Sequence, residues 1–306
     1  GYPTDMKYFL RFAAIDIGSN AIRLLLSAVF NNETGPVFKK MTLVRMPIRL
    51  GGDAFLTGEI SDQKTLELVT AMKGFQHLIN AYAPLAIMAF ATSAMRVAEN
   101  GPQVCRQIQL ETGINVEIIS GKREAEILFK NRREAIFYKD GPTMFVDVGG
   151  GSTEITVYSE GKAITSESFN IGTVRVLEDI VPKSDWKKLK NWLQTHTEAY
   201  PKISAIGSGG NINKTFRLAG GKSRKPISYK KLKDIATYLG GFTNAQRVTD
   251  LGMRPDRADV ILPALTIYRR VMKWGHAEQI FVPILGLADG MIQILYKKYR
   301  NENYQT

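Results

Sequence analysis

The most constraining feature of this sequence is a pattern that occurs twice: a buried apolar strand, an aspartate, a glycine-rich turn and a second strand. The first copy covers residues 12–27, where Asp16 precedes a Gly-Ser-Asn turn. The second covers residues 144–158, where Asp147 takes the equivalent place and the turn is one residue longer. Apolar runs on both sides of a tight polar turn predict a β-hairpin in each copy. The chain therefore contains an internal duplication.

Further strand and helix patterns follow each hairpin. Helices are predicted over residues 62–81, 184–198 and 287–299, and strands over residues 86–93 and 116–120. Residues 203–210 are predicted to open a third glycine turn. This order predicts an α/β protein with two units in tandem, each about the size of an ordinary domain. We expect the natural chain to begin at Met6, with domain I over residues 6–125 and domain II over 126–289. The terminal helix, residues 290–306, is expected to pack on domain I.

Composition narrows the class of protein. Cys105 is the only cysteine, which excludes an intramolecular disulfide and a cysteine-rich zinc site. No apolar run approaches the roughly 20 residues that a membrane-spanning helix needs. The histidines, His77, His196 and His276, lack metal-ligand spacing and are interpreted as structural. We therefore expect a cytoplasmic globular protein that does not enter a membrane.

The charge of the chain predicts a polyanionic partner. The formal net charge is +12, and residues 199–233 contain no acidic side chain. Polyphosphate, nucleic acid and acidic lipid all carry the complementary charge. The absence of an aromatic stacking motif near this basic segment disfavours nucleic acid. For any single lysine the alternative interpretation is a solvated surface charge.

The two glycine turns are suited to phosphate, because glycine lets several backbone N–H groups approach one anion. The candidate phosphate-binding glycines are Gly18, Gly149, Gly150 and Gly151. Magnesium prefers oxygen ligands, so Asp16 and Asp147 could together hold one Mg²⁺ against phosphate oxygens. An aspartate before a glycine turn is also a common turn former. The duplication favours the metal-binding interpretation.

Several segments resemble the signature segments of the exopolyphosphatase/guanosine pentaphosphatase (Ppx/GppA) family, in order and in spacing. They are Ile15-Asp-Ile-Gly-Ser-Asn20, Ala91-Thr-Ser-Ala-Met-Arg96, Glu117-Ile-Ile-Ser-Gly-Lys-Arg-Glu-Ala-Glu126, Val146-Asp-Val-Gly-Gly-Gly-Ser-Thr-Glu154, Asn170-Ile-Gly-Thr-Val-Arg175 and Arg257-Ala-Asp-Val-Ile-Leu-Pro-Ala264. The resemblance extends from about Ala13 to Gly290. It implies two ribonuclease H-like domains of the actin, sugar kinase and heat-shock ATPase superfamily, with an interdomain cleft.

The resemblance also implies an activity. It is the Mg²⁺-dependent hydrolysis of the terminal phosphoanhydride of inorganic polyphosphate or of guanosine pentaphosphate (pppGpp), which releases phosphate. We expect a homodimer, and K⁺ stays open as an additional ion. Two alternatives also stay open: an actin-like nucleotide-binding or scaffold protein without a hydrolytic role, and an ATP-dependent kinase of the same superfamily.

The matching positions imply roles for individual residues. Glu124 is the expected general base for the attacking water; Arg123 stands where relatives often have an acid, which keeps Glu126 open as the alternative. Arg96 is the expected phosphate clamp, because a guanidinium can bind two phosphate oxygens at once. Glu154 is either a second acid near the metal, as ligand or water-positioning group, or an ordinary strand residue.

The remaining expected residues contact phosphate. Ser19, Asn20 and Ser152 are expected to face the scissile phosphate together with Arg96. The third glycine turn, Gly207, Ser208, Gly209 and Gly210, matches a nucleotide-contacting turn in superfamily relatives and would extend the phosphate path. The expected polyanion path beyond it consists of Lys214, Arg217, Lys222, Arg224 and Lys225.

Overall fold

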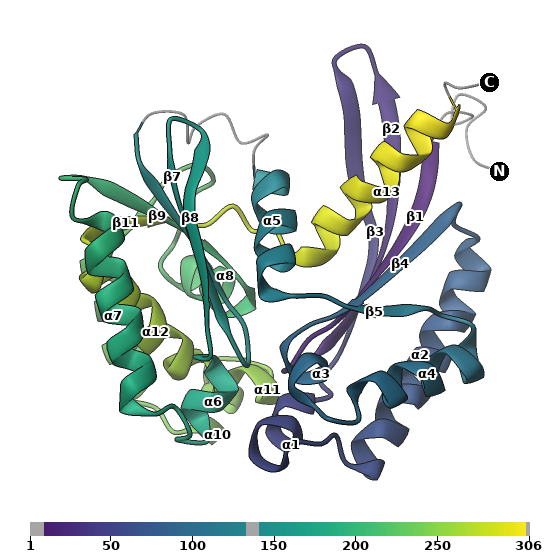
Figure 1. Ribbon diagram of the computed structural model, residues 1–306, viewed down its shortest axis with the longest axis horizontal. Coiled ribbons are helices and arrows are strands. Elements are labelled where there is room, and N and C mark those ends of the chain that lie inside the picture. Colours follow the sequence, from purple (N-terminus) through teal and green to yellow (C-terminus); the bar gives the residue numbers. More distant parts are fainter. Residues whose placement is uncertain (1–8, 133–140, 304–306) are drawn as a thin grey trace. The chain divides into compact units, whose positions relative to one another are not determined.

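The computed structural model describes residues 9–132 and 141–303, so the expected start at Met6 lies outside the described residues. The chain divides into two compact units: unit 1 contains residues up to Ile119 and from Leu287 onward, and unit 2 contains Ser120–Gly286. Each unit has its own β-sheet flanked by helices (Figure 1). The expected domain ranges stay a prediction.

Unit 1 is built on a five-stranded sheet with the order β3-β2-β1-β4-β5. Its strands are β1 (Phe9–Ile17), β2 (Ile22–Asn32), β3 (Gly35–Met46), β4 (Ala86–Ala91) and β5 (Val116–Ile118). Its helices are α1 (Leu50–Thr57), α2 (Asp62–Tyr82), α3 (Ser93–Val97), α4 (Gly101–Thr112) and α13 (Leu287–Asn303). β1 and β2 pair antiparallel up to the turn, which confirms the first predicted hairpin, whereas β4 lies parallel to β1.

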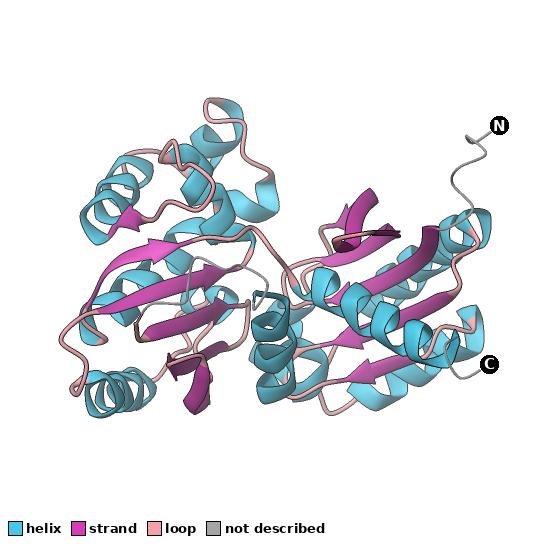
Figure 2. Ribbon diagram, turned by 90° about the horizontal axis from the view of Figure 1, so that it is seen from above, coloured by secondary structure: helices cyan, strands magenta, loops and turns pink. Residues whose placement is uncertain are grey.

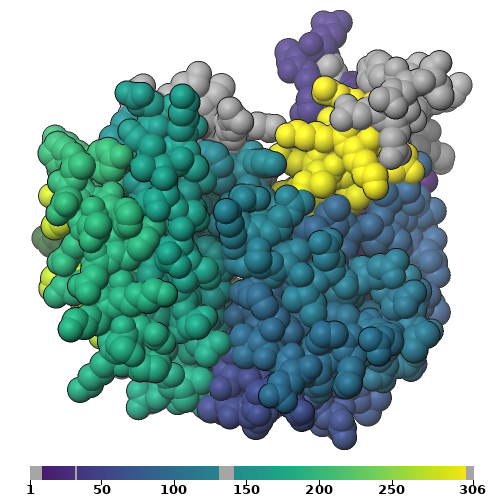
Figure 3. Space-filling model, in the orientation of Figure 1, coloured from purple at the N-terminus to yellow at the C-terminus, as the bar shows by residue number. Residues whose placement is uncertain are grey.

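Both faces of β1 are covered, which explains its continuous apolar run. On one face Ala13, Ile15 and Ile17 pack in a core with side chains of α2 and α4. On the other face lies α13, where the Tyr299 ring meets the Phe12 ring edge-on at 5.8 Å between centroids. Figure 2 shows helices on both sides of this sheet. In the space-filling view α13, coloured yellow, forms part of the surface of unit 1 (Figure 3).

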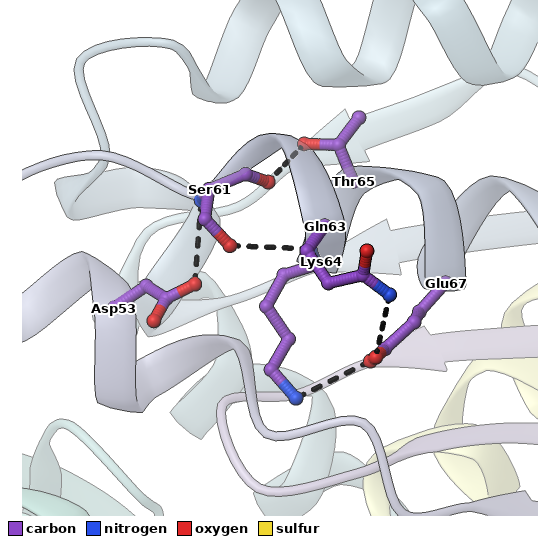
Figure 4. A network of polar contacts seen from close by, with 6 residues as sticks. All are labelled: Asp53, Ser61, Gln63, Lys64, Thr65 and Glu67. Atoms are coloured by element: carbon purple, nitrogen blue, oxygen red, sulfur yellow. Dashed lines mark hydrogen bonds and ion pairs between the residues drawn. The ribbon is translucent and has the colours of Figure 1, made fainter.

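The start of α2 is fixed by a polar network (Figure 4). The Ser61 hydroxyl accepts the Lys64 N–H at 3.1 Å, and the Ser61 N–H donates to the Asp53 carboxylate at 3.3 Å. Such an N-cap satisfies backbone donors that have no partner inside the helix. Hydrogen bonds from Gln63 and Lys64 lower the pKa of Glu67 one turn further on. The helix predicted over residues 62–81 is thus confirmed, with a defined first turn.

Unit 2 repeats the arrangement in a six-stranded sheet with the order β10-β11-β9-β6-β7-β8. Its strands are β6 (Thr143–Val148), β7 (Thr153–Ser159), β8 (Lys162–Phe169), β9 (Ile203–Ser208), β10 (Ile227–Ser228) and β11 (Ala277–Phe281). Its helices are α5 (Gly121–Arg132), α6 (Thr173–Leu177), α7 (Lys183–Thr197), α8 (Gly210–Leu218), α9 (Tyr229–Gly240), α10 (Asn244–Thr249), α11 (Pro255–Ala258) and α12 (Ile261–Trp274). The β6–β7 pair confirms the second predicted hairpin.

The two sheets share one topology. If β6, β7, β8, β9 and β11 are matched in chain order to β1–β5, both sheets have the same strand order, and unit 2 adds β10 at one edge. The internal duplication read from the sequence is therefore a duplication of the fold. Among the described helices, none is both long enough and apolar enough to cross a membrane.

Candidate functional site: a carboxylate cluster beside glycine turns

Three acidic side chains of unit 2 gather at one place. Glu124 on α5, Asp147 on β6 and Glu154 on β7 each bring a carboxylate oxygen within 4.8 Å of the other two. Asp147 and Glu154 are buried, at 7% and 2% exposure, and Glu124 is half-buried. Glu126, on the same helix, is exposed and lies outside the cluster. The geometry therefore favours Glu124 over Glu126 for any role at this cluster.

The pairing of β6 with β7 and the absence of a side chain at Gly121 together bring the three carboxylates close. Asp147 and Glu154 are directly paired across the antiparallel β6–β7 hairpin, so their side chains lie on the same face. Helix α5 packs on β7 and β8 and begins at Gly121. A Cβ at Gly121 would lie 3.0 Å from the Glu154 carboxyl carbon and 2.8 Å from the Ser168 hydroxyl. Glycine therefore lets the first turn of α5, which carries Glu124, approach Glu154 closely.

Two hydroxyl groups hold the Glu154 carboxylate. Ser152 donates to Oε1 at 2.6 Å, and Ser168 on β8 donates to Oε2 at 2.5 Å. Hydrogen bonds from hydroxyls to an ionised carboxylate are short and stronger than neutral ones. With one donor on each oxygen, the plane of the carboxylate is fixed. Glu154 is therefore a buried and oriented carboxylate, and its role in the reaction stays a prediction.

The donor set of the cluster fits a hard cation. Like charges this close raise one another's energy unless a proton or a cation neutralises them, and burial increases the cost. All the donors are carboxylate oxygens, which Mg²⁺ and Ca²⁺ prefer, and no histidine or cysteine is among them. The Asp147 charge is also felt nearby: burial, and then Asp147, raise the pKa of Tyr268 well above its ordinary value. The cluster can thus hold a divalent cation.

The second glycine turn presents backbone N–H groups in one direction. The carbonyls of residues 149, 150 and 151 accept hydrogen bonds from residues 173–175 at 2.9, 2.9 and 2.7 Å. A trans peptide points its N–H opposite to its C=O, so the N–H groups of residues 150–152 point away from that segment. A Cβ at Gly172 would lie 2.4 Å from the Gly150 backbone, which shows how closely the segments pack. Successive N–H groups on one side form an anion-binding concavity.

The third glycine turn lies next to the second at the same edge of the sheet. β6 and β9 run parallel, with Asp147 paired to Ser208, so both turns follow the carboxyl ends of neighbouring strands. Open α/β sheets bind ligands at this edge. Gly209 has φ +134, and Gly210 lies so close to Arg257 that a Cβ would be 2.3 Å from its guanidinium. The Arg257 guanidinium therefore covers the start of α8.

The expected site residues of unit 1 are largely committed to local contacts. The Ser19 hydroxyl accepts the Ala94 N–H at 3.1 Å, and the Asn20 amide oxygen accepts from Arg49 at 2.8 Å. Arg96 donates from Nη1 to the Ile119 carbonyl at 2.6 Å. A guanidinium has five N–H donors, so this bond does not preclude phosphate binding. The roles of these residues stay predictions.

Asp16 occupies the position in unit 1 that Asp147 occupies in unit 2. Burial raises the pKa of Asp16, and the charge of Arg23, its cross-strand partner, opposes that shift. Its role as a metal ligand stays a prediction.

The comparisons with known proteins agree with this fold. Residues 29–298 match the sequence profile of the Ppx/GppA phosphatase family. The chain belongs to this family. The chain is 23% identical to exopolyphosphatase 1 of Mycobacterium tuberculosis over 92% of its own length and 87% of that protein.

Solved Ppx/GppA structures show the same architecture. A Cytophaga hutchinsonii exopolyphosphatase superposes with a TM-score of 0.81 at 22% identity, covering 94% of this chain and 98% of that one. An Aquifex aeolicus Ppx/GppA enzyme gives a TM-score of 0.71 at 23% identity, covering 93% and 99%. The expected α/β fold of two ribonuclease H-like domains is thus confirmed, as is the family resemblance.

Within this Ppx/GppA chain, the structure brings together some of the expected residues and adds others. Arg217, Arg224 and Lys225 line one cavity, whereas Lys214 and Lys222 are not among its lining residues. Gly207 is enclosed by Ile280, Ile212 and Tyr268, so packing explains the glycine there. The Ser208 hydroxyl donates to the Leu285 carbonyl at 3.1 Å.

Sequence reasoning assigned no role to Gly121, Ser168 or Arg257. Gly121 and Arg257 stood inside the quoted motifs, so their positions were a signal that could have been followed. Ser168 lay outside them. Only the β7–β8 pairing of Glu154 with Ser168 identifies it as a contact.

Proposed function

We propose that this chain hydrolyses the terminal phosphoanhydride of inorganic polyphosphate, of pppGpp, or of both, in a Mg²⁺-dependent reaction that releases phosphate. The observation that carries the proposal is the cluster of Glu124, Asp147 and Glu154 in the same unit as two glycine turns at one sheet edge. An acidic cluster supplies a base and cation ligands, and the turns supply phosphate contacts. Family membership and the name of the M. tuberculosis relative support the same reaction class.

The residues have distinct proposed roles. A carboxylate oxygen of Glu124 accepts a proton from the attacking water, whose oxygen forms the new bond to the terminal phosphorus. The bridging P–O bond breaks, and the shortened chain leaves. The N–H groups of residues 150–152 bind phosphate oxygens. Mg²⁺, held by Asp147 and Glu154 with Asp16 as the further ligand expected from the sequence, would neutralise negative charge on the phosphate.

The test compares two variants of one helix. Glu124→Gln keeps the shape of the side chain but cannot accept the proton, so phosphate release should fall by about 10²- to 10⁴-fold. Glu126→Gln is the matched control, because Glu126 is exposed on the same helix and lies outside the cluster. Release is measured from medium-chain polyphosphate and from pppGpp, with Mg²⁺ and with EDTA.

Each result has a clear meaning. The proposal is supported if phosphate release requires Mg²⁺, is lost in Glu124→Gln and persists in Glu126→Gln. The relative rates with polyphosphate and pppGpp then give the substrate preference of the enzyme. Equal losses in both variants would contradict the role of Glu124. No release from either substrate with Mg²⁺, in the presence or absence of K⁺, would contradict the proposed function.

A further inference from the structure

A cavity in unit 2 combines an apolar wall with a basic rim. Its volume is about 310 Å³, within the range of small-molecule sites. The rim consists of Arg217, at the end of α8, and of Arg224 and Lys225 in the loop that follows. The apolar wall of the cavity consists of Phe216, Phe281, Val282, Pro283 and Ile284, together with Leu285.

The charge of this cavity suits an anion. Its described lining contains no acidic residue, and its basic rim belongs to the segment 199–233, which has none. An inorganic polyphosphate would satisfy the basic rim but offers no apolar surface for the wall. A ligand that carries both a planar apolar group and phosphate satisfies both parts.

Two of the six described non-glycine residues with positive φ line this cavity. Arg224 has φ +66, at the third position of a turn closed by the Lys225 N–H to the Lys222 carbonyl at 3.0 Å. Ile284 has φ +55, which is a rare conformation for a β-branched residue. Glycine would adopt either conformation without cost. Two non-glycine residues kept in this conformation in the lining of one cavity support a role for their side chains.

The cavity adjoins the candidate site through a short chain of contacts. Leu285, in its lining, accepts a hydrogen bond from the Ser208 hydroxyl at 3.1 Å. Ser208 is the strand partner of Asp147 in the carboxylate cluster. The cavity therefore lies along the sheet edge to which the proposed function assigns phosphate binding.

We propose that this cavity binds the base of a nucleoside phosphate, with the base against the Phe216 and Ile284 side and phosphate oxygens on Arg217 and Arg224. That this cavity influences the choice of substrate rests on the proposed function, whereas the binding of a nucleotide in the cavity does not. The apolar wall lets the cavity distinguish a nucleotide, which carries a base, from inorganic polyphosphate, which does not. Arg224 and Ile284 are the specificity-determining residues.

The test uses substitutions that relieve strain while they remove side chains. Arg224→Gly and Ile284→Gly both suit a left-handed backbone, so neither should lower the melting temperature through the backbone. Calorimetric titration of the full chain with GDP, with ADP and with inorganic tripolyphosphate measures binding. We expect Arg224→Gly to weaken nucleotide binding at least about tenfold, as for a lost charge-assisted hydrogen bond. Ile284→Gly should weaken nucleotide binding but leave tripolyphosphate binding unchanged.

Lys233→Ala is the matched control, because this exposed lysine of the same acid-free segment does not line the cavity. It should leave nucleotide binding within about twofold, the level of a surface substitution. The proposal is overturned if neither nucleotide binds, or if Lys233→Ala and Arg224→Gly weaken nucleotide binding equally. It is also overturned if Ile284→Gly leaves nucleotide binding unchanged. If nucleotides bind with the expected pattern but no substrate releases phosphate, the nucleotide-binding role of the cavity is supported and the proposed function is refuted.

Discussion

Removing the Ser168 hydroxyl isolates what holds Glu154 in place. That hydroxyl donates to Oε2 at 2.5 Å, while Ser152 donates to Oε1 at 2.6 Å, and the carboxylate between them is 2% exposed. Ser168→Ala removes one of the two donors and adds no atom. Ser168 is therefore a positioning residue if Glu154 takes part in the reaction as proposed.

The size of the effect follows from the type of bond. A hydrogen bond to a charged group contributes about 1.5–3 kcal/mol net. If the transition state needs Glu154 ionised and fixed, this loss corresponds to about a 10- to 150-fold fall in kcat/KM. Because Ser168 is not expected to touch the substrate, kcat should fall and KM should change little.

The assay is steady-state phosphate release from polyphosphate with saturating Mg²⁺, over a range of pH. The lost donor leaves the carboxylate easier to protonate, so the acidic limb of the activity profile should move to higher pH. Ser168→Thr keeps a hydroxyl and should restore most of the activity.

Ser166→Ala provides the matched control. Ser166 lies two residues earlier on β8, and its hydroxyl shares a hydrogen bond with the neutral Thr156 hydroxyl at 2.9 Å. It should leave kcat within about twofold. The reasoning is refuted if Ser168→Ala and Ser166→Ala behave alike, or if Ser168→Ala lowers the melting temperature without changing kcat or the pH profile.

Three further predictions test the surrounding structure. Gly172→Ala places a methyl 2.4 Å from the Gly150 backbone, so the turn must move and phosphate release should fall at least about tenfold, with an unchanged circular dichroism spectrum. Ser61→Ala removes the N-cap of α2 and should cost about 1 kcal/mol of unfolding free energy, measured in urea; an unchanged midpoint would show that the cap contributes nothing. Burial raises the pKa of Cys105 to about 11, so Ellman's reagent at pH 8 should react slowly with the native protein and rapidly after unfolding; rapid native reaction would contradict this burial.

The sequence was sufficient to predict the fold because the relevant signals are local. An apolar run, an aspartate and a glycine turn determine a hairpin over about 15 residues, and the pattern occurs twice. Strand register then places Glu154 opposite Asp147 by counting alone. The sequence placed Glu154 near Asp147 only through the family resemblance, and the register now supplies the physical reason.

The remaining site features depend on packing between distant segments. Ser168 reaches Glu154 because β8 pairs with β7, and Gly121 matters because α5 docks on both strands. A serine and a glycine are common residue types and carry no local signal for such contacts. In the same way, the charges of the basic segment could be counted in the sequence. The cavity that they share with the distant residues 281–285, and the positive φ of Arg224 and Ile284, could not be predicted from it.

The two copies of the hairpin differ in the charge of one cross-strand pair, and this difference bears on the proposed cation site. In unit 1 the partner of Asp16 is Arg23, whereas in unit 2 the partner of Asp147 is Glu154. An opposite charge directly across a hairpin stabilises an aspartate, and a like charge destabilises it. In the first pair the Arg23 charge opposes the effect of burial on Asp16. The second pair, with Glu124 added, places three acidic side chains together in a largely buried place. Such a cluster needs a cation to be stable when ionised, so we expect the proposed cation site to depend more on the turn of unit 2 than on Asp16 alone.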